Sequence, residues 1–266
     1  MSIALVRGIE MAYEDVGSGP PVVLLHGYPF NRSMWREQAE MLSGRYRVIT
    51  PDLRGHGETN ATQEPATIAE MAQDIAALLD KLEIEQAIVG GLSMGGYVAL
   101  AFYRRYGLRR VRALILADTR SQADTPDARR NREEQAEKIL KQGMSSIVDD
   151  FLKKVLTPAM LSEQPDIAER VRSMVVTTKP QGAAAVLRAM AVRPDQTDFL
   201  PEIIAPTLII VGSEDQLTPP VDAEMMHREI RGSRLEIIEG ASHLSNLERP
   251  IEFNRALKNF LDALQP

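Results

Sequence analysis

The sequence predicts an α/β fold in which a mainly parallel sheet is flanked by helices. Short apolar runs typical of buried strands alternate along most of the chain with longer stretches of helical periodicity. Such alternation is typical of parallel sheets covered by helices. A second observation is that residues 90–96 join a strand-like run to an amphipathic helix through closely spaced glycines.

The composition is that of an ordinary globular protein. The 266 residues are 44% hydrophobic and 26% charged, and the net charge of −6 gives a nucleic-acid role no electrostatic support. Because cysteine is absent, disulfides, thiolate metal sites and a cysteine nucleophile are excluded. The amino terminus lacks a basic start followed by a long apolar stretch, and no run approaches membrane-spanning length. We therefore expect a cytoplasmic protein without membrane association.

The first part of the chain supplies most of the predicted strands. They are expected at residues 3–6, 11–16, 22–25, 48–50, 87–89 and 113–117. The continuous apolar run 22–25 suits a strand covered on both faces. One helix is predicted from Ser33, as N-cap, to Leu42, and another from Ile68 to Leu82, where apolar residues recur at helical spacing.

The alternation stops after Asp118 and resumes near residue 207. In between, the sequence is helical, charged and interrupted by prolines, and only residues 174–176 resemble a strand. Helices are expected at residues 129–141, 145–156, 166–176 and 182–190, strands at 207–211 and 235–238, and closing helices at 220–230 and 251–264. We predict that residues 121–197 form a helical cap inserted after the sixth strand, and that residues 1–120 and 198–266 form the core.

Ser93 is the predicted nucleophile because residues 91–95 carry the pattern G-x-S-x-G. A strand that turns sharply into a helix holds its central residue in a strained conformation. Glycines two residues before and after the serine remove Cβ atoms that would collide at the bend. The turn presents the hydroxyl at the carboxyl end of the sheet, beside a helix amino terminus that favours an oxyanion.

A serine hydroxyl needs a base, and four histidines are available. His26 and His56 lie in glycine-containing loops, which we expect them to brace, and His227 lies in the middle of a helix. His243 leaves the last strand on a loop of small residues, so it lies at the sheet edge that presents Ser93. His243 is therefore the predicted base.

The base needs an acid that fixes its tautomer and stabilises the imidazolium. Asp215 lies just past the penultimate strand, which gives the chain order nucleophile, acid, histidine. Two rivals remain at the same edge. Glu214 is adjacent to Asp215 but is expected to point the other way, and Asp118 follows the sixth strand. The structural alternative for these carboxylates, and for Asp215 in particular, is a helix cap.

An oxyanion needs two donors. The N–H of Met94, immediately after the nucleophile, is the first. The second is expected from the loop at residues 26–29, where Gly27 lets the backbone approach closely and the N–H of Tyr28 is available. The side chain of Tyr28 either packs on the cap or contacts substrate through its hydroxyl.

Five motifs occur in an order that resembles the α/β-hydrolase fold. They are His26-Gly27, residues 52–57, 91–96 and 212–215, and residues 240–243. They are similar to its esterase, lactonase and peptidase branch, which includes 3-oxoadipate enol-lactonases and cofactor-free perhydrolases. The resemblance implies an eight-stranded sheet with the second strand antiparallel. It also implies a triad of Ser93, Asp215 and His243, and oxyanion donors Tyr28 and Met94. Dehalogenases and epoxide hydrolases differ, because they use aspartate in place of Ser93.

These residues predict a serine hydrolase that cleaves carboxylic esters with short to medium acyl chains, or lactones. Ser93 attacks the acyl carbonyl while His243 accepts its proton, and water then releases the acid from an acyl-enzyme. We expect a small-molecule ester as substrate, no cofactor or metal, and a monomer or homodimer. The alternatives are a perhydrolase or lyase that uses the same triad, and a non-catalytic ligand receptor of the same fold.

We expect two further groups of residues, arginines and methionines, to have structural roles and not catalytic ones. The first is a run of arginines at the far end of the helix after Ser93, which we interpret as a solvated basic surface: Arg104, Arg105, Arg109, Arg110 and Arg112. The second is a set of methionines in the predicted cap, which we expect to serve packing more than substrate contact: Met144, Met160, Met174 and Met190.

Overall fold

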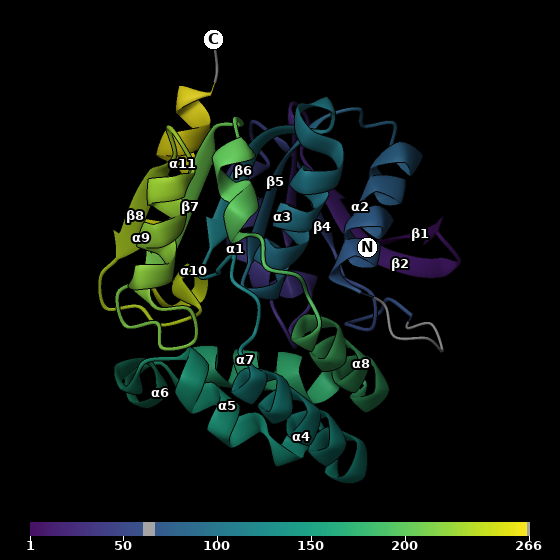
Figure 1. Cartoon of the computed structure of the whole chain (residues 1–266), viewed down its shortest axis with the longest axis vertical. Coiled ribbons are helices and arrows are strands. Elements are labelled where there is room, and N and C mark those ends of the chain that lie inside the picture. Colours follow the sequence, from purple (N-terminus) through teal and green to yellow (C-terminus); the bar gives the residue numbers. More distant parts are fainter. Residues whose placement is uncertain (61–66, 265–266) are drawn as a thin grey trace.

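The centre of the protein is an eight-stranded sheet (Figure 1), seen in a computed structural model that describes residues 1–60 and 67–264. The strands run in the spatial order β1-β2-β4-β3-β5-β6-β7-β8. Their bounds are β1 (Ser2–Val6), β2 (Ile9–Val16), β3 (Pro21–Leu25), β4 (Arg47–Pro51), β5 (Ala87–Leu92), β6 (Val111–Ala117), β7 (Thr207–Gly212) and β8 (Arg234–Ile238). β2 is antiparallel to β1 and β4, whereas the pairs from β4 to β8 are parallel. The predicted fold class is confirmed.

The described residues form the following α-helices. They are α1 (Arg36–Leu42), α2 (Ile68–Lys81), α3 (Met94–Tyr106), α4 (Pro126–Gln142), α5 (Val148–Val155), α6 (Pro158–Glu163), α7 (Pro165–Thr177), α8 (Pro180–Ala191), α9 (Pro220–Glu229), α10 (Ser245–Glu248) and α11 (Pro250–Ala263). Short 3₁₀ segments are η1 (Arg32–Trp35), η2 (Gly107–Arg109), η3 (Met144–Ser146) and η4 (Thr197–Glu202). α2 packs against α3, and α1 packs against α11. None of the helices in the described residues is long and apolar enough to cross a bilayer.

The central strands are buried on both faces, which explains their composition. Every residue of β5 and β7 is buried, and so is every residue of β3 after Pro21. A parallel strand between two layers of helices has no solvent face, so its sequence is a continuous apolar run without alternation. The helices that cover it are amphipathic, and α2 begins at a capping box formed by Thr67 and Glu70.

Five helices, α4 to α8, follow β6 and precede β7. They gather at one end of the sheet, at the bottom of Figure 1. Four of them begin with a proline, namely Pro126, Pro158, Pro165 and Pro180. Proline suits the first turn of a helix because the N–H it lacks would have no intrahelical acceptor there. Four of the five prolines in residues 121–197 are therefore helix starts, and Pro194 lies outside the helices. Residues 174–176 lie in α7 instead of a strand.

The contact between α11 and η1 gives a test of the core. Phe253 on α11 is fully buried, and its ring centroid lies 6.1 Å from that of Trp35. We expect Phe253→Ala to lower the free energy of unfolding by about 3–5 kcal/mol, because it leaves a cavity between α11 and η1. Urea denaturation measures the change.

The matched control lies on the same helix. Ile251 is 77% exposed, so Ile251→Ala should change the free energy of unfolding by less than about 0.5 kcal/mol. Equal effects of the two substitutions would contradict this account of the face that α11 buries.

Candidate active site

Ser93 lies at a tight turn between β5 and α3, in a conformation that residues with side chains rarely adopt. Its φ is 54° and its ψ is −114°. The neighbouring glycines leave no room for side chains. A Cβ on Gly91 would lie 2.1 Å from the carbonyl carbon of Gly95, and a Cβ on Gly95 would lie 2.1 Å from the carbonyl oxygen of Leu25. The G-x-S-x-G spacing is thus required by backbone contacts within the turn and with the end of β3.

The strained turn is held in place by the neighbouring strand β6 and the residues that follow it. The N–H of Ser93 donates to the carbonyl oxygen of Ala117 at 2.9 Å. The hydroxyl of Thr119 donates to the carbonyl oxygen of Ser93 at 2.7 Å. Such a conformation persists only where the surrounding structure enforces it, and these two bonds fix the main chain of Ser93 on both sides. Sequence analysis did not find the role of Thr119.

His243 and Asp215 form a buried hydrogen-bonded pair. Nδ1 of His243 donates to Oδ2 of Asp215 at 2.8 Å. The same carboxylate accepts bonds from the N–H of Leu217 at 2.8 Å, and from the N–H and hydroxyl of Thr218 at 3.0 and 2.7 Å. Asp215 is therefore fixed by donors from its own loop while it holds the ring of His243.

Thr218 was missed by sequence analysis, although a local signal exists. An aspartate that accepts from the N–H groups two and three residues further on forms a common turn, and threonine suits such a turn. The hydroxyl of Thr218 also lies 3.3 Å from Nδ1 of His243, so it contacts both members of the pair.

The loops that carry the acid and the histidine are packed directly against each other. A Cβ on Gly212, at the end of β7, would lie 2.2 Å from the carbonyl oxygen of Ser242. The N–H of Glu214 donates to the carbonyl oxygen of Ala241 at 2.9 Å. Because β7 and β8 are parallel neighbours, both loops leave the sheet at the same edge. This register brings Asp215 to His243 across 28 residues of sequence.

The interaction between His243 and Asp215 shifts the pKa of each residue in the direction opposite to burial. Burial lowers the pKa of His243, but the negative charge and hydrogen bond of Asp215 more than offset it, so the pKa lies above its ordinary value. Burial raises the pKa of Asp215, and the interactions with His243 and Thr218 outweigh it, so that pKa lies below the ordinary value. Asp215 thus stabilises the imidazolium that forms whenever His243 accepts a proton.

The two rival acids occupy different environments. Glu214 is exposed, whereas Asp215 is buried. Asp118 is also fully buried, but its oxygens accept bonds from the N–H of Gly212 at 2.9 Å and the hydroxyl of Ser245 at 2.5 Å. Burial and then the charge of Asp215 raise the pKa of Asp118 well above its ordinary value. Asp118 therefore ties β6 to β7 and α10.

The other histidines lie in the surroundings that the sequence indicates. Nε2 of buried His26 accepts from the N–H of Leu53 at 2.8 Å, and burial lowers its pKa to about 4. Nδ1 of buried His56 donates to the carbonyl oxygen of Arg54 at 3.3 Å, and burial lowers its pKa to about 3. Both rings connect loops and stay uncharged at neutral pH. His227 is exposed on α9.

Tyr28 and Met94, the predicted oxyanion donors, lie in two segments that touch. Met94 is the first residue of α3, where N–H groups have no acceptor within the helix. The loop after β3 approaches this helix start closely, because a Cβ on Gly95 would lie 2.9 Å from the carbonyl oxygen of His26. A Cβ on Gly27 would lie 3.3 Å from the carbonyl oxygen of Leu92. The two donor roles remain predictions.

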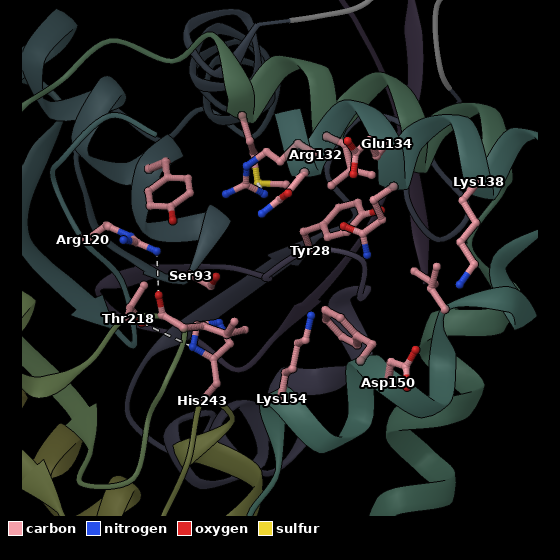
Figure 2. Close-up of a pocket in the computed structure, with 18 residues that line it drawn as sticks. Tyr28, Ser93, Arg120, Arg132, Glu134, Lys138, Asp150, Lys154, Thr218 and His243 are labelled. Carbon is pink, nitrogen blue, oxygen red and sulfur yellow. Dashed lines mark hydrogen bonds between the residues drawn. The ribbon is translucent and has the colours of Figure 1, made fainter. Parts of the chain in front are cut away.

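Ser93 and His243 open onto the same cavity of about 470 Å³ (Figure 2). Tyr28 and Thr218 line it from the core, and residues of α4 and α5 line it from the opposite side. This volume suits a small molecule. Among residues 1–60 and 67–264, no group of three or more histidine or acidic side chains is arranged to hold a metal ion.

Most arginines of the run at residues 104–112 are on the surface, and the methionines of the insertion are buried. Arg110 pairs with Asp80 at 2.7 Å and is half-buried, and the remaining arginines of the run are exposed. Those arginines do not line the cavity. The four methionines between β6 and β7 are buried, and Met190 also lines the cavity.

Comparison with known proteins decides the family. A model of the alpha/beta hydrolase fold family matches residues 20–250. The chain belongs to this family. It is 32% identical over 248 residues to 3-oxoadipate enol-lactonase 1 of Acinetobacter baylyi, covering 93% of this chain and 91% of that protein.

Solved structures of an esterase and an enol-lactonase are similar to this chain over nearly its whole length. A thermophilic esterase from Thermogutta terrifontis, determined with malate bound, superposes with a TM-score of 0.96 at 39% identity and covers 100% of this chain and 99% of its own. The enol-lactonase from Burkholderia xenovorans LB400 has a TM-score of 0.92 at 30% identity and covers 98% and 100%. With esterases and enol-lactonases among these relatives, the α/β hydrolase described here is a carboxylic-ester hydrolase.

The raised pKa of His243 predicts the pH dependence of activity. Protonated His243 cannot act as a base, so kcat/KM should fall as the pH drops through this pKa. Asp215→Asn removes the charge that raises the pKa. The acid limb of the profile should then move to lower pH, and kcat should fall by about 10²–10⁴-fold, since the imidazolium loses its partner. Ester hydrolysis followed from about pH 5 to 9 measures both.

Glu214→Gln is the matched control because it removes a carboxylate from the adjacent, exposed position. It should leave the acid limb where it is. An acid limb that stays in place or moves to higher pH in Asp215→Asn would contradict the assignment of Asp215.

Proposed function

We propose that this hydrolase cleaves carboxylic esters with short to medium acyl chains, or lactones, through an acyl-enzyme on Ser93. One observation carries the proposal: Ser93 and His243 line the same cavity. Asp215 binds Nδ1 of His243 at 2.8 Å, which leaves Nε2 for Ser93. The lactonases and esterases among its relatives support the same chemistry.

The geometry supports a two-step mechanism. Because Nδ1 of His243 is bonded to Asp215, Nε2 is the nitrogen that takes the proton of Ser93 as its oxygen attacks the carbonyl. The N–H groups of Met94 and Tyr28 stabilise the oxyanion that forms. Collapse of this tetrahedral intermediate breaks the ester bond, and His243 returns the proton to the departing alcohol.

Water completes the cycle by the same route. His243 removes a proton from a water molecule, which attacks the acyl carbonyl and forms a second oxyanion at the same donors. Its collapse releases the carboxylic acid and returns the proton to Ser93. In both steps the charge of Asp215 stabilises the imidazolium.

Residues 121–197 act as a cap in this proposal. Side chains of α4, α5 and α8 form the cavity wall opposite Ser93, including Arg132, Lys154 and Met190. In this proposal these side chains limit the size of the acyl group that fits between them and Ser93.

Substitution of the nucleophile tests the mechanism. Ser93→Ala should lower kcat/KM for nitrophenyl esters by more than about 10⁴-fold, because the acyl-enzyme cannot form. The assay buffer contains neither peroxide nor cyanide, so that perhydrolysis and lyase chemistry do not contribute. A fluorophosphonate should label the wild type at Ser93, as located by peptide mass spectrometry.

Ser162→Ala is the control, since Ser162 is exposed on α6 and does not line the cavity. It should keep full activity and labelling. Undiminished turnover by a correctly folded Ser93→Ala variant would refute the acyl-enzyme, and a wild type that binds esters without turning them over would indicate a receptor.

A further inference from the structure

Glu248 is a buried carboxylate that the proposed mechanism does not use. It is the last residue of α10 and is 4% exposed. Its Oε1 accepts from the N–H of Ser242 at 2.8 Å. Its Oε2 accepts from the N–H of Thr157 at 2.9 Å and from the hydroxyl of Thr157 at 2.8 Å. One carboxylate therefore joins two segments that are far apart in the sequence.

The cost of burying this charge determines where the carboxylate lies. Burial raises the pKa of Glu248 above its ordinary value, although the bonds from Thr157 and Ser242 oppose the shift. A buried charge is tolerated where hydrogen-bond donors replace the water that it has lost. Because all three bonds are donated to the carboxylate, removal of one donor leaves an oxygen poorly solvated. Both segments are thus held in place around Glu248.

The Ser242 side of this contact is next to the proposed base. Ser242 immediately precedes His243 in the chain. Asp215 binds the ring of His243 at Nδ1, with a distance of 2.8 Å, and Glu248 binds the main chain just before it. A functional side chain is held in a productive geometry by the hydrogen bonds of its own atoms and by those of the segment that carries it. The position of Nε2 of His243 therefore depends on both carboxylates.

The Thr157 side belongs to the helical insertion (α4 to α8). Thr157 is the N-cap of α6, and its hydroxyl accepts from the N–H of Met160 at 3.1 Å. The acceptor and donor roles of this hydroxyl are both fixed, since it donates to Glu248. Lys154, near the end of the preceding helix α5, lines the cavity, as His243 does (Figure 2). Glu248 consequently connects the main chain of the proposed base to the helical insertion.

We propose that Glu248 is a positioning residue for His243, and that through Thr157 it makes the alignment of this base depend on the position of the helical insertion on the core. Loss of the contact leaves His243 its acid partner but lets its loop move. A displacement of about 1 Å near the reacting groups can cost about 100-fold in rate, so a small movement is sufficient. This inference rests on the proposed function, because it concerns the base that acts there.

The first test removes the hydroxyl of Thr157 and keeps the charge of Glu248. Thr157→Val should lower kcat for nitrophenyl acetate about 3- to 10-fold, because one of the three bonds to the carboxylate is lost. KM should change by less than about twofold, since Thr157 does not line the cavity. Thr157→Ser keeps the hydroxyl and should restore kcat to within about twofold of the wild type.

The second test changes the carboxylate itself. The amide of Glu248→Gln has the same shape but presents an NH₂ group on one side, so it cannot accept from both Ser242 and Thr157. It should lower kcat about 10- to 100-fold. Adding Thr157→Val to this variant should lower kcat by less than about a further twofold, because the two residues act through one contact.

Thr125→Val is the matched control. Thr125 is the N-cap of α4 in the same insertion, and its hydroxyl accepts from the N–H of Ala128 at 3.2 Å. The substitution removes the same kind of helix cap as Thr157→Val does, but Thr125 is exposed and does not line the cavity. It should leave kcat unchanged. Thermal unfolding of each variant shows that it is folded at the assay temperature.

A spectroscopic measurement separates this inference from the proposed function. The proton that Nδ1 of His243 donates to Asp215 gives a downfield NMR resonance, because the hydrogen bond deshields it, and His243→Gln assigns it. Thr157→Val and Glu248→Gln should shift or broaden this resonance, whereas Thr125→Val should leave it in place. This result supports the positioning role even if no ester is hydrolysed.

Several outcomes would overturn the role of Glu248, whether or not Ser93 forms an acyl-enzyme. They are wild-type kcat in Thr157→Val, an equal loss of kcat in Thr125→Val, fully additive effects of the Thr157 and Glu248 substitutions, and an unchanged His243 resonance in Glu248→Gln.

Discussion

The strained main chain of Ser93 is the constraint on which the rest of the structure depends. A residue at a φ of 54° is unstable unless neighbouring segments hold it, and here β3, β5 and β6 do so together. The glycines at 91 and 95 let these segments approach to contact distance. The same close approach brings the loop of Tyr28 to the start of α3. One steric requirement therefore fixes the positions of the proposed nucleophile and of the proposed oxyanion donors.

Three buried carboxylates fix the loops around His243. Asp215 holds the ring of His243, and Asp118 ties the ends of β6 and β7 to α10. Glu248 connects the loop of His243 to the helical insertion. Its oxygens accept from the N–H of Ser242 at 2.8 Å, and from the N–H and hydroxyl of Thr157 at 2.9 and 2.8 Å. Each carboxylate is fully engaged, as a buried polar group must be.

The helical insertion gives the cavity its chemical character. The core supplies Ser93, His243 and Thr218, which suit any acyl carbonyl, whereas α4 and α5 supply most of the charged wall. Positive side chains there offset the negative charge of the whole protein locally. The side chains proposed for catalysis and most of the charged wall thus come from separate parts of the chain, which meet across one cavity of about 470 Å³.

The sequence by itself determined the strands, most of the helices and the order of Ser93, Asp215 and His243, because apolar periodicity and glycine spacing are local properties. It also placed His26 and His56 in loops that they brace. It misjudged the insertion locally, where prolines that mark helix starts resembled interruptions and the short helix α6 gave no periodic signal. It also missed the short helix α10, which follows β8.

Only the tertiary structure decided which side chains meet. It buried Asp215 and exposed the adjacent Glu214, and it engaged Asp118 with Gly212 and Ser245. It also joined Thr157 to Glu248 across 91 residues. A contact of this kind depends on how whole elements pack and on the register of neighbouring strands. No local pattern records that packing, so a residue's burial and its partners become known only when the chain is folded.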